Sequence, residues 1–516
     1  MCEVSKGKEN INIQNNDSFE NNTTIAETKD CNRICQKTIN DKTISDPTPN
    51  KNEIKIIEWR FNQYLGEKLS EEEIRDEENQ SYIITDIKTS DRGDIVVAGE
   101  KGGRIILFQK AQKSPKNKAF SKLQYFYEYS AYDKDFDVHK STEYSEAVRC
   151  LSVLPTYSQD KIDILSCSYR TIKLNRVYNY KQKLFTNDDY FYERNSTGDK
   201  PITIPKLRSI KYDLKAKNKI NITLYNSNEL NSLSYNKQFT NQFLTSDDNK
   251  ILLWDMNHIN DPYCIVDLEE SSTNSIEEYS EKVTKSLISD SNPNIISYGT
   301  NYGSIQLLDT RTSSDFLKYS TSFVDEFLNI TNSGFNLTKT IFSSQVMAVH
   351  DLNFSLNDEN LFASRHYLSV NIWDKRNNKS PVSRFLVYEP VISKLSYLYL
   401  NNYLLNDKFS LSADKTGRYI ATGRYNNMFH VFDIEQRLNT QITVDSSNEK
   451  NMNTNIIRKI NSKGSCYYKK DDPAWENINF KKKIGKICYS PVDNYLVFPT
   501  ENCINTYNGN VITKKL

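Results

Sequence analysis

The chain has 516 residues, enough for two or three ordinary domains, and its 67 Lys and Arg against 66 Asp and Glu give a net charge of +1. This balance argues against a protein that binds nucleic acid or a membrane surface through its overall charge. The 33 Tyr and 23 Phe, against only 15 Gly, favour strands over helices.

Cysteine and histidine spacing argues against a disulfide framework or a zinc site. The nine cysteines are far apart except for Cys31 and Cys35, and the five histidines form no ligand-spaced set. We therefore expect reduced thiols, as in a protein of the cytosol or nucleus, and no bound metal or cofactor. No apolar run reaches the ~18 residues of a membrane span. The first twenty residues lack the apolar core of a signal peptide.

Residues 1–52 are polar, rich in Asn and poor in aromatic residues. Such a segment cannot bury enough apolar surface to offset the entropy of ordering, so a disordered tail is predicted. Residues 53–516 are predicted to form one folded unit. Its first apolar run is Ile56–Phe61, which stands alone before the first repeat. Because ring-shaped repeat folds often close with a terminal segment, we expect this run to complete the last repeat.

One strand type recurs through the rest of the chain. In Tyr367–Asp374, apolar residues alternate with other residues at a spacing of two, which is typical of a half-buried strand, and the run ends in Trp-Asp. The related runs are Ile251–Asp255, Ser304–Asp309 and Met428–Asp433, with weaker copies at Gly103–Gln109, Thr171–Arg176 and Cys503–Asn508. Seven copies predict an all-β, seven-bladed WD-repeat β-propeller, in which each unit buries its apolar face against its neighbours.

In chain order, the predicted blades lie at 82–109, 148–177, 230–256, 282–310, 346–375, 409–434 and 483–507. Their spacing exceeds the ~40–45 residues of ordinary propeller blades, so the extra residues are assigned to the connections, where binding sites are common. An aromatic and charged segment at about 123–147 is predicted to be a protruding β-hairpin arm. A second segment, at about 438–475, is predicted to be a long, disordered insertion.

The sequence has no Gly-x-Ser-x-Gly elbow, phosphate-binding loop or His-Glu-x-x-His motif, so a non-enzyme is predicted. Glu100–Gly103 is interpreted as a hairpin turn, because no helical pattern follows that could aim an N-terminus at a phosphate. The pair Asp247-Asp248 fits a turn with Asx hydrogen bonds and a surface acid that recognises basic partners. It also fits a metal site, although obvious partner ligands are missing.

Several stretches are more specific than a generic repeat. They are Val96–Lys110 (VVAGEKGGRIILFQK), Asp133–Ser141 (DKDFDVHKS), Ser168–Leu174 (SYRTIKL), Leu244–Met256 (LTSDDNKILLWDM), Gly299–Arg311 (GTNYGSIQLLDTR), Arg365–Asp374 (RHYLSVNIWD) and Gly423–Asp433 (GRYNNMFHVFD). Through these stretches and their order, the chain from about Ile56 onward resembles the WD-repeat regulatory B subunit, of the 55-kilodalton type, of serine/threonine protein phosphatase 2A.

The resemblance implies a non-catalytic regulatory and targeting subunit. Such a subunit docks on the helical-repeat scaffold subunit and recruits phosphoprotein substrates to the catalytic subunit, with one face of the ring toward the scaffold and an acidic groove toward the substrate. The residues carried over are Phe136 and Asp137 for the scaffold, on the hairpin arm, and Lys101, Asp247, Asp248 and Tyr425 for the substrate. A cytoplasmic location is implied, with the nucleus as a second compartment. The alternative is a WD-repeat scaffold or adaptor of another multiprotein assembly.

Overall fold

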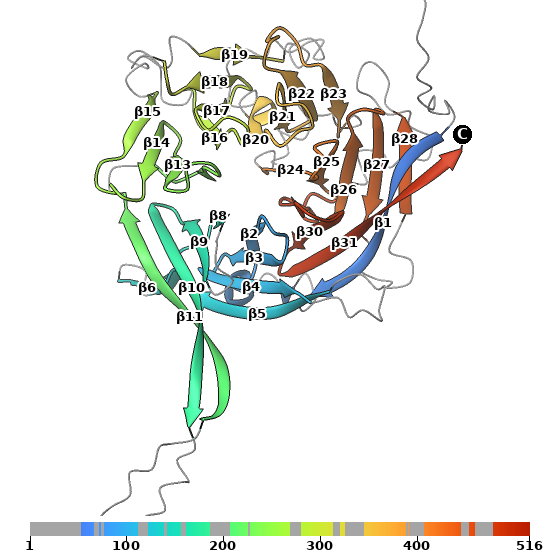
Figure 1. Ribbon diagram of the computed structural model, residues 1–516. Helices are drawn as coiled ribbons and strands as arrows, with labels where there is room; N and C mark the ends of the chain where they lie inside the picture. Colours follow the sequence, from blue (N-terminus) through green and yellow to red (C-terminus); the bar gives the residue numbers. More distant parts are fainter. Residues whose placement is uncertain are drawn as a thin grey trace, which may run out of the picture. The chain divides into compact units, whose positions relative to one another are not determined.

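The computed structural model describes residues 53–66, 72–73, 77–111, 122–138, 142–155, 161–185, 207–224, 228–268, 280–312, 320–325, 345–388, 391, 407–444, 454–459 and 478–515. The chain separates into two units, one of which comprises Met1–Glu53 with Lys515–Leu516 and the other Ile54–Lys514. The fold of the second unit is shown in Figure 1. The predicted tail, residues 1–52, lies outside the described residues.

In the described part of this unit, seven sheets of four or five strands form the ring. In six of them neighbouring strands are consecutive in the chain, and in the seventh the first strand of the chain lies beside the last. Blade 1 contains β2 (Ile84–Thr89), β3 (Ile95–Glu100), β4 (Arg104–Lys110) and β5 (Leu123–Ser130). Blade 2 contains β8 (Cys150–Leu154), β9 (Lys161–Cys167), β10 (Thr171–Phe185) and β11 (Leu207–Thr223). Blade 3 contains β12 (Ser232–Tyr235), β13 (Gln242–Ser246), β14 (Lys250–Asp255) and β15 (Tyr263–Asp267). Blade 4 contains β16 (Val283–Ile288), β17 (Ile295–Thr300), β18 (Ile305–Asp309) and β19 (Thr321–Phe323).

The last three blades repeat this plan with small variations. Blade 5 contains β20 (Val349–Asn353), β21 (Leu361–His366), β22 (Ser369–Asp374) and β23 (Ser383–Leu386). Blade 6 contains β24 (Leu411–Ala413), β25 (Tyr419–Arg424), β26 (Met428–Asp433), β27 (Leu438–Thr443) and a fifth strand, β28 (Thr454–Lys459). Blade 7 contains β29 (Cys488–Tyr489), β30 (Tyr495–Thr500), β31 (Cys503–Lys515) and β1 (Glu53–Leu65). The predicted seven-bladed β-propeller is therefore confirmed.

The recurring Trp-Asp strands are the third strands of their blades, and their tryptophans are packing residues. Trp373 on β22 is fully buried, stacks on Phe362 and donates its indole N–H to Ser364 Oγ at 2.9 Å. Trp254 on β14 makes the equivalent bond to Thr245 Oγ1 at 2.8 Å. A buried indole that keeps a hydrogen-bond partner adds apolar area without leaving an unsatisfied donor.

The ring closes through the N-terminal strand, as the sequence predicted. β1 lies beside β31 as the outer strand of blade 7, so this one sheet contains both the first and the last strand of the propeller. Trp59 on β1 is fully buried and meets Tyr489 and Phe429 edge to face, with ring centroids 5.6 and 6.4 Å apart. Burial of large aromatic side chains of this kind dominates the stability of such an interface.

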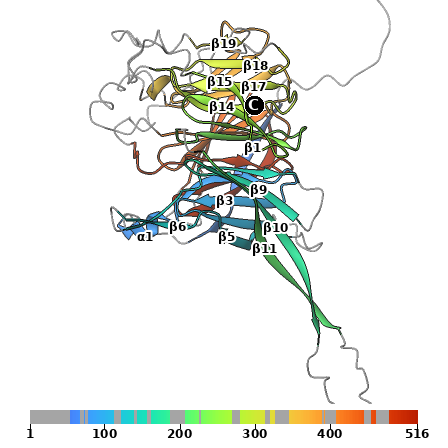
Figure 2. The same ribbon diagram turned by 90° about the vertical axis from the view of Figure 1, so that its left-hand side faces the viewer.

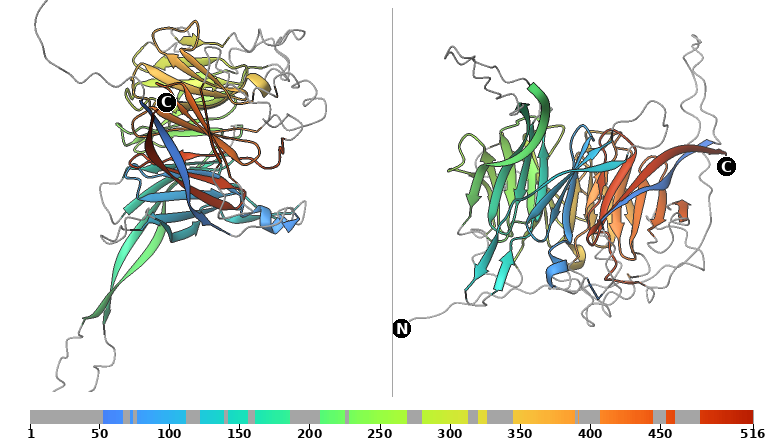
Figure 3. Two further views of the ribbon diagram at one scale, coloured as in Figure 1. Left: turned by 90° about the vertical axis from the view of Figure 1, so that its right-hand side faces the viewer. Right: turned by 90° about the horizontal axis from the view of Figure 1, so that it is seen from below.

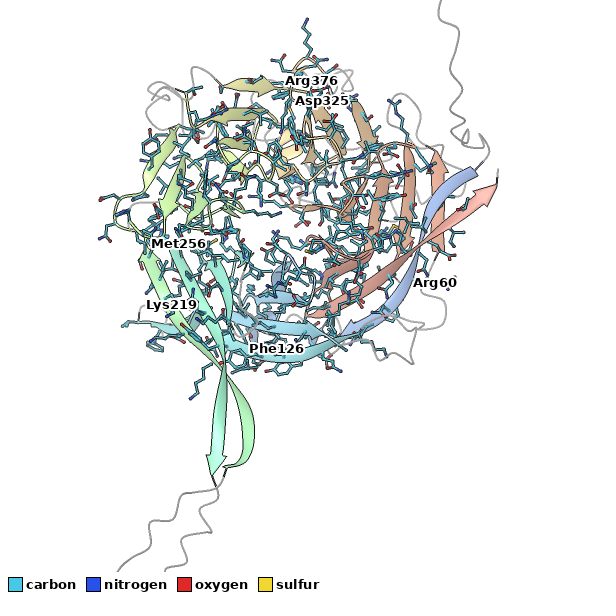
Figure 4. All side chains as sticks on the ribbon, in the orientation of Figure 1. Arg60, Phe126, Lys219, Met256, Asp325 and Arg376 are labelled. Atoms are coloured by element: carbon cyan, nitrogen blue, oxygen red, sulfur yellow. The ribbon has the colours of Figure 1, made fainter. Side chains whose placement is uncertain are left out.

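Inner strands of neighbouring blades are tied together by buried carboxylates. Asp86 on β2 accepts a hydrogen bond from the backbone N–H of Leu151 in blade 2 at 2.8 Å. Asp351 on β20 accepts one from the backbone N–H of Leu411 in blade 6, also at 2.8 Å. The inner strands of successive blades contact one another around the whole ring, and blade 7 contacts blade 1. Figure 4 shows side chains filling the spaces between adjacent blades, with Phe126 on the outer strand of blade 1.

The structure divides the segment predicted as a hairpin arm, 123–147, into two elements. Its first part, Leu123–Ser130, is β5, which pairs with β4 as the outer strand of blade 1. Only β6 (Lys134–Asp137) and β7 (Thr142–Ser145) form a separate two-stranded hairpin. The prediction was too wide because an outer blade strand and a free hairpin show the same alternation of apolar and polar residues.

Among the described residues, the longest projection comes from blade 2, in the connection between the predicted blades 148–177 and 230–256. β10 pairs with β11 from Thr171–Thr223 out to Phe185–Leu207, whereas its pairing with β9 ends at Tyr178. Beyond Tyr178, β10 and β11 therefore form a two-stranded ribbon, which extends away from the ring in Figure 1. We call this two-stranded part, residues 179–185 of β10 and 207–214 of β11, the ribbon.

Two parts of the insertion predicted at 438–475 are strands of blade 6. Leu438–Thr443 is β27, which pairs with β26, and Thr454–Lys459 is β28, which pairs with β27. The sequence LNTQIT has only two aliphatic residues, so its polar composition concealed the fourth strand of blade 6, whose side chains are nonetheless mostly buried. Residues 445–453 and 460–475 lie outside the described part of the chain. In the described part, no helix is long and apolar enough to span a bilayer.

Candidate functional site

Blade topology divides the loops of the ring between two faces. In a four-stranded antiparallel blade, the turn between the second and third strands lies at the same end as the connection to the next blade. We call this end the connection face; its second-to-third-strand turns include residues 101–103, 247–249 and 425–427. Helix α1 (Glu77–Gln80) and the β6–β7 hairpin lie in blade-to-blade connections and therefore on this face, whereas the ribbon leaves toward the opposite face (Figures 2 and 3).

The predicted substrate-binding residues all lie in turns of the connection face, although in three different blades. Lys101 is in the β3–β4 turn and is exposed. Its Nζ donates a hydrogen bond to Gln80 Oε1 at 3.0 Å. Gly103 has a φ of 83° and completes the turn with a bond from its N–H to the carbonyl of Glu100 at 3.1 Å. The interpretation of Glu100–Gly103 as a hairpin turn is confirmed.

Asp247 and Asp248 differ in their surroundings. The side chain of Asp247 is buried, and its Oδ1 accepts bonds from the backbone N–H groups of Asn249 at 2.8 Å and Lys250 at 2.6 Å. It therefore acts as an Asx turn, one of the roles that the sequence left open. Asp248 is half-buried, accepts a bond from the side-chain amide of Asn231 and lies 3.2 Å from Lys282 Nζ. Of the two carboxylates, Asp248 is the one available to a partner.

Tyr425 is a buried residue of the β25–β26 turn rather than an exposed contact. Its hydroxyl donates to Asp407 Oδ2 at 3.0 Å, and its backbone N–H donates to the hydroxyl of Tyr388 at 2.9 Å. Burial, together with the neighbouring tyrosines and Asp407, raises the pKa of Tyr425 far above its ordinary value, so the phenol stays protonated. The substrate-binding role predicted for these four residues stays a prediction.

A cavity of about 650 Å³ opens on the connection face where blades 6, 7 and 1 meet, and it includes Lys101. Basic residues of its lining are Lys101, Lys408, Lys481, Lys482, Lys483 and Lys486. The acidic residues of the lining are Asp407 and Glu501, so the formal balance is six minus two, or +4. We call this the lysine cavity. The resemblance implied an acidic groove on this face, and the cavity beside Lys101 has the opposite charge.

The lysines reach the cavity from three separate parts of the chain. Lys101 comes from blade 1, Lys408 precedes blade 6, and Lys481–Lys486 precedes blade 7. Lys483 forms an ion pair with Asp407, and Lys486 Nζ lies 3.6 Å from Asp86 Oδ1. The charge of Asp86 raises the pKa of Lys486 and outweighs the opposing effect of burial.

The predicted scaffold-binding residues lie on the β6–β7 hairpin. Phe136 is 54% exposed, and Val138, two residues further on, is 77% exposed. Asp137 pairs with Thr142 across the hairpin. The structure thus presents apolar surface next to the predicted contact, but from the same face as Lys101 and Asp248. Their scaffold-binding role also stays a prediction.

The opposite face has an opening of its own at the ring axis, lined by inner-strand residues from all seven blades, with a volume of about 750 Å³. We call it the central mouth. Its charged lining residues are Lys88, Lys237, Lys285 and Lys415 with Asp91, Asp290, Asp351 and Asp414. Among the described residues, no group of three or more His, Cys, Asp or Glu is placed to hold a metal ion.

Comparison with known proteins finds a regulatory subunit that is similar to this chain over most of its length. No protein-family model matches the chain. The protein phosphatase PP2A 55 kDa regulatory subunit of Drosophila melanogaster is 27% identical over 454 residues, which cover 86% of this chain and 85% of that subunit. The chain is a distant relative of this regulatory subunit. The crystal structure of Chaetomium thermophilum Raptor matches with a TM-score of 0.46 and 11% identity, over 88% of this chain and 30% of that one.

Sequence reasoning found Lys101 but missed the lysines that surround it. The run Lys481-Lys482-Lys483 was visible, but it was divided between a predicted connection and the start of the predicted blade 483–507. Lys408 gave no signal, because it is a single lysine in the connection between the predicted blades 346–375 and 409–434. Only the closure of the ring brings these segments, which are more than seventy residues apart (408 to 481), beside the β3–β4 turn.

Proposed function

We propose that this chain is a non-catalytic regulatory and targeting subunit of protein phosphatase 2A. It docks on the scaffold subunit and holds phosphoprotein substrates beside the catalytic subunit. The observation that carries the proposal is the similarity to the 55 kDa regulatory subunit, which extends over 86% of this chain and 85% of the relative. A similarity of that extent is far longer than the single repeat that many propellers share.

The physical basis of targeting is a rise in local concentration. A rigid ring that binds a substrate on one surface and the scaffold on another turns dephosphorylation into an intramolecular event. The buried aromatic clusters and the bonds between inner strands supply the required rigidity. We propose the cytoplasm as the site of action, with the nucleus as a second compartment.

Two projecting elements are candidates for the scaffold contact. The β6–β7 hairpin has the exposed Phe136, but it lies on the connection face, together with the predicted substrate-binding residues. The ribbon extends toward the opposite face, which leaves the connection face accessible to substrate. Because scaffold and substrate must bind at the same time, they need separate faces of the ring. We therefore favour the ribbon as the main scaffold contact and the β6–β7 hairpin as a secondary one.

Affinity purification from native extract, followed by mass spectrometry, tests the function. The full chain should recover a helical-repeat scaffold subunit and a phosphatase catalytic subunit, and the isolated chain should not hydrolyse phosphopeptides. Recovery of a different assembly without these subunits would instead identify an adaptor of that assembly. Turnover of phosphopeptides by the isolated chain would contradict the non-catalytic role.

The docking element is tested by shortening the ribbon. Replacing residues 180–213 with an Asn-Gly turn joins Asn179 to Leu214, which already face each other across the two strands. This variant keeps the part of β10 that pairs with β9. It should lose most binding to the purified scaffold subunit, whereas Phe136→Ala should lose less. The reverse order would assign docking to the β6–β7 hairpin.

A further inference from the structure

The lysine cavity concentrates positive charge in a chain that is almost neutral overall. Like charges that share a cavity repel one another, more strongly where protein walls exclude water. Lys483 and Lys486 are offset by Asp407 and Asp86. Lys101 is instead bonded to the neutral amide of Gln80. A positive excess therefore remains, and an anionic ligand would relieve the repulsion.

The segment that carries most of these lysines is fixed to the ring by its backbone. Ile484 N–H donates to the carbonyl of Arg424 at 3.0 Å, and the carbonyl of Gly485 accepts from Ser410 N–H at 2.9 Å. At the start of the segment, Asn479 N–H donates to Asn426 Oδ1 at 2.6 Å. These bonds hold the segment against blade 6 on one side and against the chain before β24 on the other. The backbone that carries these lysines is thus held in place before any ligand arrives, which lowers the entropic cost of binding.

Size and lining indicate the class of ligand. At about 650 Å³, the cavity lies within the roughly 300–1,000 Å³ of typical ligand sites. Each lysine offers three N–H donors, and a phosphate group offers three strong acceptor oxygens with a charge of about −1.5 to −2. Ile83, Ile84 and Pro499 add apolar wall beside the lysines. A phosphate attached to a peptide can use both kinds of surface, whereas a free ion can use only one.

We propose that the lysine cavity binds a phosphoserine- or phosphothreonine-bearing segment of a protein substrate. This inference rests on the proposed function, because the substrates of a phosphatase carry such groups. The phosphate held in the cavity is retained while another phosphate of the same substrate reaches the catalytic subunit. The cavity would thereby select substrates that are phosphorylated at more than one position.

Fluorescence anisotropy on the full chain tests the proposal with a labelled peptide that carries two phosphoserines among neutral and apolar residues. The phosphorylated peptide should bind at least about tenfold more tightly than its unphosphorylated form, and added NaCl should weaken it. The double substitution K101E/K481E, in two segments of the cavity, should lower the affinity by about tenfold or more. The affinity of the milder variant K101Q/K481Q for the phosphopeptide should lie between those of the unmodified chain and K101E/K481E.

A matched control separates the cavity from overall charge. K379E/K415E changes the net charge by the same amount, and both lysines are exposed in turns of the opposite face. This variant should bind the phosphopeptide like the unmodified chain, and the thermal unfolding midpoints of all variants should agree. Equal weakening by the two charge reversals would overturn the proposal, as would equal binding of the two peptides. Stronger binding to single-stranded RNA or to phosphatidylserine vesicles than to the phosphopeptide would also overturn it.

The phosphopeptide site and the proposed function can fail independently of each other. K101E/K481E should still co-purify with the scaffold and catalytic subunits, because the cavity is not the docking element. Co-purification without phosphopeptide binding by the unmodified chain would refute the phosphopeptide site and leave the regulatory function standing. Phosphopeptide binding without recovery of the phosphatase subunits would refute the proposed function instead.

Discussion

The lysine cavity and the central mouth are openings of similar volume, about 650 and 750 Å³, on opposite faces of one ring. Four lysines and four aspartates line the mouth, and pairs such as Lys237–Asp290 at 2.9 Å and Lys285–Asp351 at 3.4 Å connect them. Six lysines and only two acidic residues line the cavity. A composition with nearly equal numbers of both charges thus produces one balanced opening and one basic opening. The difference lies in the positions of the charged residues and not in their total number.

Both openings require a closed ring, so the largest expected effect comes from the closing strand. Trp59→Ala removes a fully buried indole between β1 and the rest of blade 7. We expect the free energy of unfolding to fall by about 3–5 kcal/mol, because the loss of transfer energy is combined with a cavity. Denaturant unfolding measures this change, and Trp59→Phe should recover part of it. An unchanged stability would show that β1 is dispensable for closure.

Two glycines allow the openings to be disturbed one at a time. A Cβ on Gly423 would lie 2.0 Å from the carbonyl oxygen of Ile484, and a Cβ on Gly417 would lie 2.1 Å from the backbone nitrogen of Asn357 at the mouth. Each alanine variant should lose about 1–3 kcal/mol of unfolding free energy, because backbone must move.

Only Gly423→Ala displaces the lysine segment, so only this variant should weaken phosphopeptide binding in the anisotropy assay. Comparable weakening by Gly417→Ala would show that the assay reports general distortion of the ring. The two openings would then be coupled, and the comparison between them would fail.

Removal of one carboxylate from the lysine cavity should increase the charge difference between the cavity and the central mouth, with a smaller expected effect. Asp407→Asn removes the carboxylate that offsets Lys483, and the amide oxygen can still accept the hydroxyl of Tyr425. Because a partly exposed ion pair contributes less than about 1 kcal/mol, phosphopeptide affinity should rise by about two- to fivefold. Asp290→Asn, which removes the partner of Lys237 at the mouth, should leave the affinity unchanged. A decrease on Asp407→Asn would contradict the electrostatic account.

The smallest expected effect on stability concerns an ion pair between Asp374 and Arg376, two residues apart in a turn of the opposite face. Arg376 donates to both carboxylate oxygens of Asp374, at 3.0 and 2.8 Å, and these bonds lower the pKa of Asp374 from 3.8 to about 2. Since the folded-state pKa lies below the ordinary value, this contribution to stability is present above pH 3.8 and is lost as the pH falls toward 2. Arg376→Gln should return the pKa of Asp374 toward 3.8, as measured by NMR titration. An unchanged pKa would show that backbone bonds alone hold it down. Arg376 lies at the outer edge of blade 5 (Figure 4), so little change in unfolding free energy is expected.

The local chemistry of the sequence determined the blades. Alternation around Trp254 and Trp373 predicted third strands, and the isolated run Ile56–Phe61 predicted the closing strand, because burial of one strand face needs only a spacing of two along the chain. The same local signal could not separate β5 from a free hairpin or reveal β27 as the fourth strand of blade 6. Tertiary structure alone decided the lysine cavity, because Lys101, Lys408 and Lys481 come together only when the ring closes. It also decided that Asp247 and Tyr425 are buried, since burial depends on neighbours that the linear sequence does not identify.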